Sequence, residues 1–391
     1  MDLDKAFYKS VFKTLFSDSC TVRYWDGEEE TYGTSTSKFT FVLCEPLAKT
    51  KFMKDPSLAF GEAFMQKKIE IEGNLQEALT SIFNSQESFM RKSMPHKKPI
   101  QLFSNNAKAR QQNIEHHYDI GNDFYKLWLD ETMTYSCAYF KTEDDSLVIA
   151  QKNKIDHILK KLCLSPSDSL LDIGCGWGDL IISAAKKYQV KALGITLSKE
   201  QFGSVQARIA EEQLQDSVEV QLVDYRALAG RTFDRIVSVG MAEHLGKSNI
   251  PKYFAQIQAL LNNGGVSLLH CITGLAEDGT NSWVNKYIFP GGYIPSVAEL
   301  VLAISKEKFN LLDLESLRRH YAKTLELWAI NFENALPEIS KNKDEEFIRM
   351  WRLYLNVFAA NFRSGNIDIH QFLFTKGIND KIPWTRDYIY Q

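Results

Sequence analysis

The chain contains 391 residues, 44% of them hydrophobic, which is enough for two domains with a sizeable core. Its 46 basic and 49 acidic residues leave a net charge of −3, which argues against a nucleic-acid-binding protein that works by bulk charge. Six cysteines without metal-ligand spacing and an N-terminus without a signal-peptide pattern predict a reduced, cytoplasmic protein. No apolar run approaches the roughly 20 residues that span a bilayer, so we expect any membrane contact to be peripheral.

Residues 1–85 have the pattern of a small α+β module. Apolar residues at four-residue spacing in 2–16 predict an amphipathic basic helix, which either packs on its own module, the favoured interpretation, or rests on anionic lipid. The other expected elements are a hairpin that turns at Asp26-Gly27, a strand from Phe39, a helix from Asp55-Pro56 to Phe64, an edge strand KIEIEG and a helix capped by Asn74.

Residues 86–113 are polar and basic and contain Pro95 and Pro99, which is typical of a linker. A segment dense in aromatic residues follows from Ile114 to Phe140. It carries too many rings for an exposed loop, so we expect it to be buried against a large apolar surface.

From residue 147 the chain alternates between helical and strand patterns. The expected order is a helix at 147–162, a strand near Leu170, a helix near Leu180, a strand near Ala192, a helix near Glu200, strands near Val218 and Phe233, a helix near Glu243 and a strand near Gly265. Such alternation predicts an α/β fold with a mostly parallel sheet and a ligand at the carboxyl ends of its strands.

The segment from Cys271 to Tyr293 interrupts this alternation and is interpreted as a lid over the site. Further helices are expected around residues 297–304, 324–334 and 347–362. The stretch FLFTKG near the end predicts a last, antiparallel strand.

The stretch SLLDIGCGWGD, residues 169–179, predicts a strand, a tight glycine turn and a helix, which is the geometry of a nucleotide-like cofactor site. The dinucleotide fingerprint requires a sixth-position glycine and an acid after the next strand, but Asp179 and GITLS stand there, so NAD is disfavoured. Glycines at 174, 176 and 178 favour S-adenosylmethionine. A turn that needs glycine for geometry alone is the competing interpretation.

Several motifs in order make the assignment more specific, namely HYDIGNDFYKLWLD, TMTYSCAYF, LDIGCGWG, GITLSKEQ, DYR, MAEHLG, LLHCITG and HYAKTLELW. From about residue 114 to the end, the chain resembles cyclopropane-fatty-acyl-phospholipid synthases and the related mycolic acid cyclopropane synthases. The resemblance implies a class I S-adenosylmethionine-dependent methyltransferase, Rossmann-like with a mostly parallel sheet. The expected division is an N-terminal α+β module at 1–85, a linker at 86–113 and a catalytic domain at 114–391.

The resemblance also implies which residues form the site. The cofactor would contact Tyr135, Ser136, Gly174, Gly176, Thr196, Leu197, Gln201, Asp224 and Tyr225. A bound bicarbonate ion would act as the base, held by Cys137, Glu243, His270, the backbone of Ile272 and Tyr321. Taken singly, Cys137 is more often a core thiol, His270 a core histidine, and Thr196 the cap of the following helix; their occurrence together favours the functional interpretation.

The expected activity is transfer of a methylene group from S-adenosylmethionine to the cis double bond of phospholipid acyl chains, forming a cyclopropane. Aromatic faces near the reacting carbons would stabilise the carbocation that methyl transfer leaves. The alternatives are a relative that gives a methyl-branched lipid or an N-methyl product, and a lipid carrier without catalysis. The expected partners are phospholipids of the inner membrane surface, not nucleic acid, and the resemblance suggests a homodimer.

Overall fold

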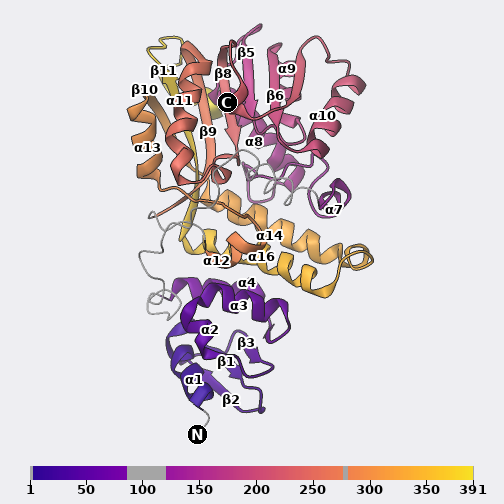
Figure 1. Ribbon diagram of the computed structural model, residues 1–391, viewed down its shortest axis with the longest axis vertical. Helices are drawn as coiled ribbons and strands as arrows, with labels where there is room; N and C mark the ends of the chain where they lie inside the picture. Colours follow the sequence, from indigo (N-terminus) through magenta and orange to yellow (C-terminus); the bar gives the residue numbers. More distant parts are fainter. Residues whose placement is uncertain (1–2, 86–119, 276–280, 391) are drawn as a thin grey trace. The chain divides into compact units, whose positions relative to one another are not determined.

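The computed structural model describes residues 3–85, 120–275 and 281–390. These residues form two compact units, each assembled from segments that are far apart in the sequence (Figure 1). The first unit draws on Met1–Leu102, Thr280–Pro290 and Leu325–Ile367, and the second on Phe103–Gly279, Gly291–Thr324 and Asp368–Gln391.

This division differs from the contiguous one expected from the sequence, with boundaries at 85 and 114. Helices that follow the catalytic motifs in sequence pack on the N-terminal helices, so the first unit is larger than the predicted module. The predicted linker at 86–113 lies outside the described residues.

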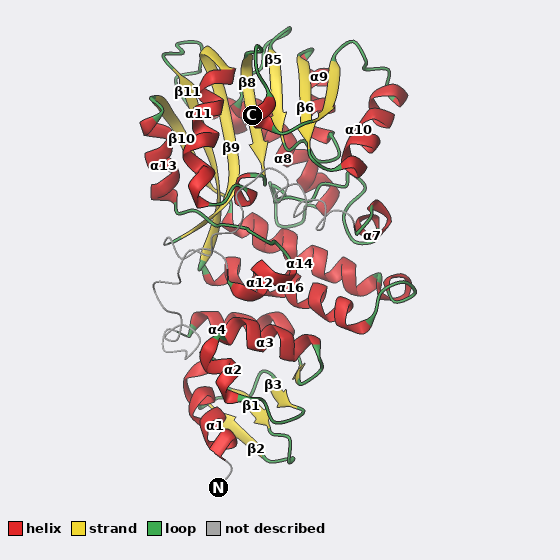
Figure 2. Cartoon of the chain, in the orientation of Figure 1, coloured by secondary structure: helices red, strands yellow, loops and turns green. Residues whose placement is uncertain are grey.

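The first unit combines a small sheet with helices (Figure 2). Its four-stranded sheet has the order β2-β1-β3-β4, so the predicted hairpin and the predicted edge strand β4 are confirmed. Its elements are α1 (Leu3–Leu15), β1 (Cys20–Arg23), β2 (Glu29–Tyr32), β3 (Thr40–Leu43), α2 (Lys49–Lys54), α3 (Pro56–Met65), β4 (Ile69–Glu72), α4 (Leu75–Asn84), α12 (Ser282–Tyr287), the later part of α14 (Arg318–Asn334), α15 (Leu336–Ile339) and α16 (Glu345–Ser364).

Helix α1 packs on its own unit, as the favoured interpretation expected. Tyr8 and Phe12 on its apolar side are buried, and the Lys5 ammonium forms ion pairs with Asp26 and Glu28 at 2.5 Å. The lipid alternative requires that this apolar side be exposed, so it is wrong for α1. None of the helices that the structure describes is both long and apolar enough to span a membrane.

Helix α12 lies within the segment 271–293, which the sequence pattern predicts to be a lid. Its Trp283 is buried against α3, where Gly61 leaves room because a Cβ there would meet the indole at 2.1 Å. The Trp283 Nε1 donates to Met65 Sδ at 3.2 Å. Residues 271–274 continue strand β9, so the lid interpretation is wrong for them, while 276–280 lie outside the described residues.

The second unit is an α/β fold with a seven-stranded sheet in the order β10-β11-β9-β8-β5-β6-β7. Strands β9, β8, β5, β6 and β7 run parallel and β10 pairs antiparallel with β11, so the predicted fold class is confirmed. Its elements are α7 (Asn122–Lys126), α8 (Leu147–Lys161), β5 (Ser169–Ile173), α9 (Asp179–Tyr188), β6 (Lys191–Thr196), α10 (Lys199–Glu211), β7 (Val218–Leu222), η1 (Tyr225–Ala227), β8 (Phe233–Val239), η2 (Ala242–His244), η3 (Lys247–Asn249), α11 (Ile250–Leu260), β9 (Leu261–Gly274), α13 (Val297–Lys306), β10 (Phe309–Ser316), the start of α14, β11 (Ile367–Lys376) and α17 (Asp387–Tyr390).

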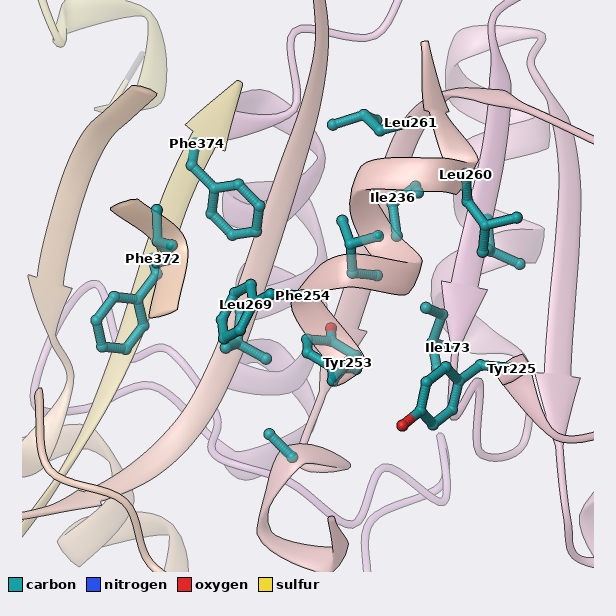
Figure 3. Packing of buried hydrophobic residues seen from close by; sticks show 14 of the residues in the cluster. Ile173, Tyr225, Ile236, Tyr253, Phe254, Leu260, Leu261, Leu269, Phe372 and Phe374 are labelled. Carbon is teal, nitrogen blue, oxygen red and sulfur yellow. The ribbon is translucent and has the colours of Figure 1, made fainter. Parts of the chain in front are cut away.

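Two apolar clusters cover the two faces of this sheet. Successive strand residues point to opposite faces, so Leu171 of β5 joins the cluster with α11 and α13, whereas Leu170 joins the one with α8, α9 and α10. Figure 3 shows the first cluster, in which Tyr253 and Phe254 of α11 lie beside the strands. Because helices cover both faces of the sheet, the edge at the carboxyl ends of the parallel strands is left open, and ligands bind at this edge in such folds.

Two further details differ from the sequence-based expectation. Strand β10 was not predicted, because its outward side chains Leu311, Leu312 and Leu314 break the usual alternation of a half-buried strand. Glu243 was placed on a helix, but it lies in the 3₁₀ turn η2. Gly246, with φ of 71°, ends this turn, and helix α11 starts only at Ile250 with a proline in its first turn.

Candidate active site

The glycine turn after β5 has the conformation that the sequence pattern predicts. Gly174, Gly176 and Gly178 all have positive φ, at 85°, 55° and 86°. At Gly178 a Cβ would also meet Val205 at 2.9 Å, so glycine is required both for conformation and for close packing before α9. The backbone N–H groups of Gly174 and Cys175 donate to the Ile195 carbonyl, which fixes the turn against β6.

A pocket lies in the second unit beside this turn, at the carboxyl ends of β5, β6, β7 and β8. The structure brings together in it every residue predicted to contact the cofactor, namely Tyr135, Ser136, Gly174, Gly176, Thr196, Leu197, Gln201, Asp224 and Tyr225. These residues come from four separate stretches of the chain, so their convergence depends on the fold and not on proximity in sequence.

Thr196 and Gln201 are locked to each other at the end of β6. The Thr196 hydroxyl donates to Gln201 Oε1 at 2.8 Å and accepts from the Ser198 N–H at 3.1 Å, and both side chains are buried. The cap of α10 is Ser198, whose hydroxyl accepts from the Gln201 N–H. The competing interpretation of Thr196 as that cap is therefore wrong.

Asp224 and Tyr225 follow β7 at the same edge of the sheet. Both Asp224 carboxylate oxygens accept from the Arg226 guanidinium, at 2.7 and 2.6 Å, so this acid is held in place. The Tyr225 ring is buried and packs edge to face on Tyr253 at 5.6 Å (Figure 3). A rigid acid beside a fixed aromatic face suits an adenine ring, which offers an amino donor and a flat surface.

The aromatic segment closes the pocket near the glycine turn. Tyr135 packs on Tyr125 and Trp128 at 5.4 and 5.5 Å, and Tyr125 packs on Trp177 of the turn at 5.8 Å. Burial is confirmed for the rings of Phe124, Tyr125, Trp128 and Phe140, whereas Tyr135 and Tyr139 are half-buried. Residues 114–119 lie outside the described residues.

Three charged residues that line the pocket, Lys154, Asp172 and Asp179, were not among the predicted site residues. Lys154 lies on the buried side of α8, and its ammonium donates to the Ser136 hydroxyl at 3.1 Å. Burial raises the pKa of Asp172 to about 7. The available signals were a lysine seven residues after Leu147, on the apolar stripe of its helix, and an acid inside an apolar strand.

Glu243 and Ile272, both predicted to hold bicarbonate, are in direct contact. The Ile272 N–H donates to Glu243 Oε1 at 2.8 Å. Oε2 of the same carboxyl is buried and has no hydrogen-bond partner among the described residues. Burial raises the pKa of Glu243 to about 7, so the carboxyl is poised to gain or lose a proton near neutral pH.

His270 lies two residues earlier on β9 and is fully buried. Its Nδ1 accepts from the Gln371 side-chain amide at 3.1 Å, which leaves the proton on Nε2 because a neutral imidazole carries only one. Nε2 has no partner among the residues that the structure describes. Burial lowers the pKa of His270 to about 3, so the ring is a neutral donor at physiological pH. Gln371 was missed because it stands in an ordinary strand pattern.

Cys137 and the backbone of Tyr321 both contact the Leu317 carbonyl at the start of α14, and the Cys137 thiol also donates to the Ala138 carbonyl at 3.2 Å. The Cys137 Sγ lies 4.0 Å from the Leu317 carbonyl, which also accepts from the Tyr321 N–H at 3.0 Å. The thiol is fully buried, which raises the pKa of Cys137 well above its usual value and keeps it protonated. The Leu317 N–H in turn donates to Ile369 on β11, the strand that carries Gln371.

The residues that line the pocket and the residues predicted to hold bicarbonate are neighbours at two points of the chain. Ser136 lines the pocket and Cys137 follows it directly, while Met241 and His244 line the pocket on either side of Glu243. None of the five residues predicted to hold bicarbonate lines the pocket itself among the described residues, but Cys137 and Glu243 directly adjoin residues that do. A base held there would act away from water.

Comparison with known proteins agrees with this geometry. The family model described as mycolic acid cyclopropane synthetase matches residues 105–372, and one for a domain of unknown function matches residues 7–94. A probable fatty acid methyltransferase of Pseudomonas putida is 38% identical over 381 residues, which cover 95% of this chain and 96% of that protein. The cyclopropane-fatty-acyl-phospholipid synthase of Escherichia coli is 37% identical and covers 86% of this chain and 87% of its own.

Solved structures show the same relationship over about two thirds of the chain or more. A cyclopropane synthase from Mycobacterium tuberculosis is 38% identical with a TM-score of 0.65, and the match covers 68% of this chain and 98% of that one. A mycolic acid cyclopropane synthase complexed with SAH and CTAB is also 38% identical, with a TM-score of 0.64 over 68% of this chain and 98% of that one. Coclaurine N-methyltransferase, at 22% identity, shares the fold, with a TM-score of 0.65 over 83% of this chain and 99% of its own.

Proposed function

The chain belongs to the mycolic acid cyclopropane synthetase family of S-adenosylmethionine-dependent methyltransferases, and we propose that it forms cyclopropane rings on unsaturated phospholipid acyl chains. The proposal rests above all on one observation: the predicted cofactor residues line one pocket, and Glu243, whose buried Oε2 has no partner among the described residues, lies between the lining residues Met241 and His244. Such a pairing fits a reaction that needs both an alkyl donor and a base.

Overall the reaction adds one carbon to a cis double bond and releases one proton. S-adenosylmethionine supplies an activated methyl group, which leaves sulfur as a new carbon–carbon bond forms, and ring closure then requires loss of a proton from the added carbon. In this proposal the glycine turn and Tyr135 bind the methionine part, Thr196 and Gln201 the ribose, and Asp224 with Tyr225 the adenine. Holding donor and acceptor in a dry pocket supplies several kcal/mol of the barrier.

The residues beside the pocket fit a bicarbonate ion. His270 Nε2 offers a neutral donor and Glu243 Oε2 offers an acceptor for a hydroxyl, and in this proposal the Tyr321 hydroxyl and the Cys137 thiol complete the set. Neutral donors bind an anion without competing for the proton, and the bound ion would supply a base. The Ile272 N–H orients Glu243, and Gln371 keeps the His270 proton on Nε2.

We expect incubation of the protein with vesicles of unsaturated phospholipid and isotope-labelled S-adenosylmethionine to add one labelled methylene to the acyl chains. Mass spectrometry of the released fatty acids checks this result, and vesicles of fully saturated phospholipid are the matched control because they offer no double bond. Acyl chains without added mass would contradict the proposal.

A second candidate is methyl branching without ring closure. The Pseudomonas putida relative is named a probable fatty acid methyltransferase, and a 35% identical protein of Mycobacterium tuberculosis is named a tuberculostearic acid methyltransferase. Methyl transfer followed by loss of a proton without ring closure gives a branched alkene with the same mass as the cyclopropane, and a saturated methyl branch would need a hydride donor in addition. Proton NMR of the released fatty acids separates the two reactions, because the ring methylene gives upfield signals whereas the branched alkene gives vinylic ones.

We also propose that the enzyme works at the cytoplasmic surface of a membrane, since its acyl substrate is there. Helix α2 offers a contact of suitable chemistry: Lys51 and Lys54 are exposed beside Met53, whose exposed fraction is 60%. Basic side chains near anionic headgroups contribute about 1 kcal/mol each, and an exposed apolar side chain inserts between them.

The double variant K51E/K54E is therefore expected to bind anionic vesicles about 10-fold or more weakly than the wild type. Vesicle co-sedimentation at low and high salt measures this, because surface attraction is screened by salt. The control variant K199E/K252E reverses two exposed lysines of the second unit. Equal loss of binding in both variants would argue for a non-specific charge effect and against a contact at α2.

A further inference from the structure

Lys154 is a buried cation that the proposed reaction does not use. Only 3% of its surface is exposed, yet it lines the cofactor pocket. Its ammonium makes one hydrogen bond, to the Ser136 hydroxyl at 3.1 Å, and forms no ion pair with any carboxylate of the described residues. Since an ammonium has three N–H donors, it retains donor capacity inside the pocket.

The acids around Lys154 are engaged elsewhere or poorly ionised. Asp179 pairs with Arg208 at 3.1 Å, and Asp130 accepts from the Thr132 hydroxyl at 2.6 Å. Burial raises the pKa of Asp172 to about 7, which reduces its charge at neutral pH. The same burial lowers the pKa of Lys154. A buried charge without a partner is costly, so a ligand that brings an anion would relieve this cost.

The pocket that holds Lys154 also holds the predicted cofactor contacts, and S-adenosylmethionine has a single anionic group. Its sulfonium and α-amino groups are cationic, and its ribose and adenine are neutral, so only the carboxylate of the methionine part can pair with an ammonium. Ser136, which Lys154 contacts, and the glycine turn line the same pocket.

We infer that Lys154 binds the cofactor carboxylate and makes the enzyme selective for ligands that carry this group. The inference rests on the proposed use of S-adenosylmethionine, but not on the acyl substrate or on ring formation. Helix α8 supports the arrangement, because its Gln151 amide donates to the Ser136 and Thr134 carbonyls at 2.9 and 3.2 Å and so fixes the strand-like segment beside Lys154.

Calorimetric binding of two ligands to the full chain tests this inference. S-adenosylhomocysteine carries the carboxylate, and its decarboxylated analogue, S-adenosyl-3-thiopropylamine, lacks it. We expect K154M to bind S-adenosylhomocysteine about 10- to 100-fold more weakly than the wild type, in line with the loss of a charge-assisted hydrogen bond. The decarboxylated ligand should bind K154M as well as, or better than, the wild type.

The control variant is K152M, which removes a lysine two residues away on α8 that is 59% exposed and pairs with Glu131. It should leave both affinities unchanged. A K154M variant that weakens both ligands equally would show a structural role and overturn the inference, as would unchanged affinity for S-adenosylhomocysteine. The inference is also overturned if the wild type binds S-adenosylhomocysteine no more tightly than the decarboxylated analogue. Binding without methylene transfer would instead count against the proposed function alone.

Discussion

Replacement of Glu243 by glutamine is expected to lower kcat by about 10²- to 10⁴-fold, the range that a general acid–base group contributes. The substitution keeps the shape of the side chain and an oxygen that can accept from the Ile272 N–H at 2.8 Å. It removes the negative charge and puts an amide in place of a carboxylate oxygen. Oε2 is buried without a partner among the described residues. The substitution is therefore expected to weaken binding of the group that Oε2 accepts from.

The pH profile gives a second readout of the same substitution. The pKa of Glu243 is about 7 because burial disfavours its charged form. Its carboxylate form therefore grows as pH rises through 7, and wild-type kcat is expected to rise between about pH 6 and 8. His270, with a pKa of about 3, stays neutral across this range and adds no step of its own. The kcat of E243Q should not rise with pH over this range.

Cofactor affinity and bicarbonate dependence separate catalysis from folding. E243Q should bind S-adenosylhomocysteine as the wild type does, and added bicarbonate at constant ionic strength should stimulate the wild type but not the variant. The control E299Q changes another partly buried glutamate of the second unit, which accepts from the Tyr293 hydroxyl at 2.8 Å, and should retain activity. A fully active E243Q, or a wild type indifferent to bicarbonate removal, would contradict the assignment of this set.

Much of the second unit could be predicted because local pattern and tertiary role agree there. The glycine turn is encoded within ten residues: Gly178 must be glycine for its φ of 86° and for its contact with Val205, so the requirement is visible in the sequence itself. The alternation of strands and helices then placed the pocket at the carboxyl ends of the strands.

What could not be predicted depends on packing between distant segments. Lys154 is recognisable as a site residue only when α8 is seen to cover the sheet beside Ser136, and Gln371 only when β11 lies beside β9. The extent of the first unit could likewise not be predicted, because the apolar stripe of α16 does not indicate which element it packs against. One arginine on that stripe links α16 to α3 and β4. The hydrophobic periodicity alone predicts that this arginine is exposed.

Replacement of this arginine, Arg349, by methionine is expected to destabilise the first unit by about 1–3 kcal/mol, the cost of taking the donor from a buried backbone acceptor. The side chain is 4% exposed, donates to the Phe64 and Ile69 carbonyls at 2.5 and 2.9 Å, and pairs with Glu70 at 2.9 Å. Methionine fills the stem but removes the guanidinium donors from both carbonyls, and the Phe64 carbonyl keeps only backbone donors such as the Lys67 N–H at 3.2 Å. A buried acceptor left without its donor costs about 1–3 kcal/mol.

Hydrogen exchange of the β4 and α3 amides measures this effect locally, and calorimetric binding of S-adenosylhomocysteine reports on the second unit separately. The matched control is R352M on the same helix, which removes a partly exposed pair with Glu333 worth at most about 1 kcal/mol. If α16 is an integral part of the first unit, R349M accelerates exchange in β4 far more than R352M does, because the strand loses a neighbour that holds its backbone. Equal exchange in the two variants would mean that α16 contributes only apolar packing, and that the N-terminal residues are the separable module that the sequence pattern predicts.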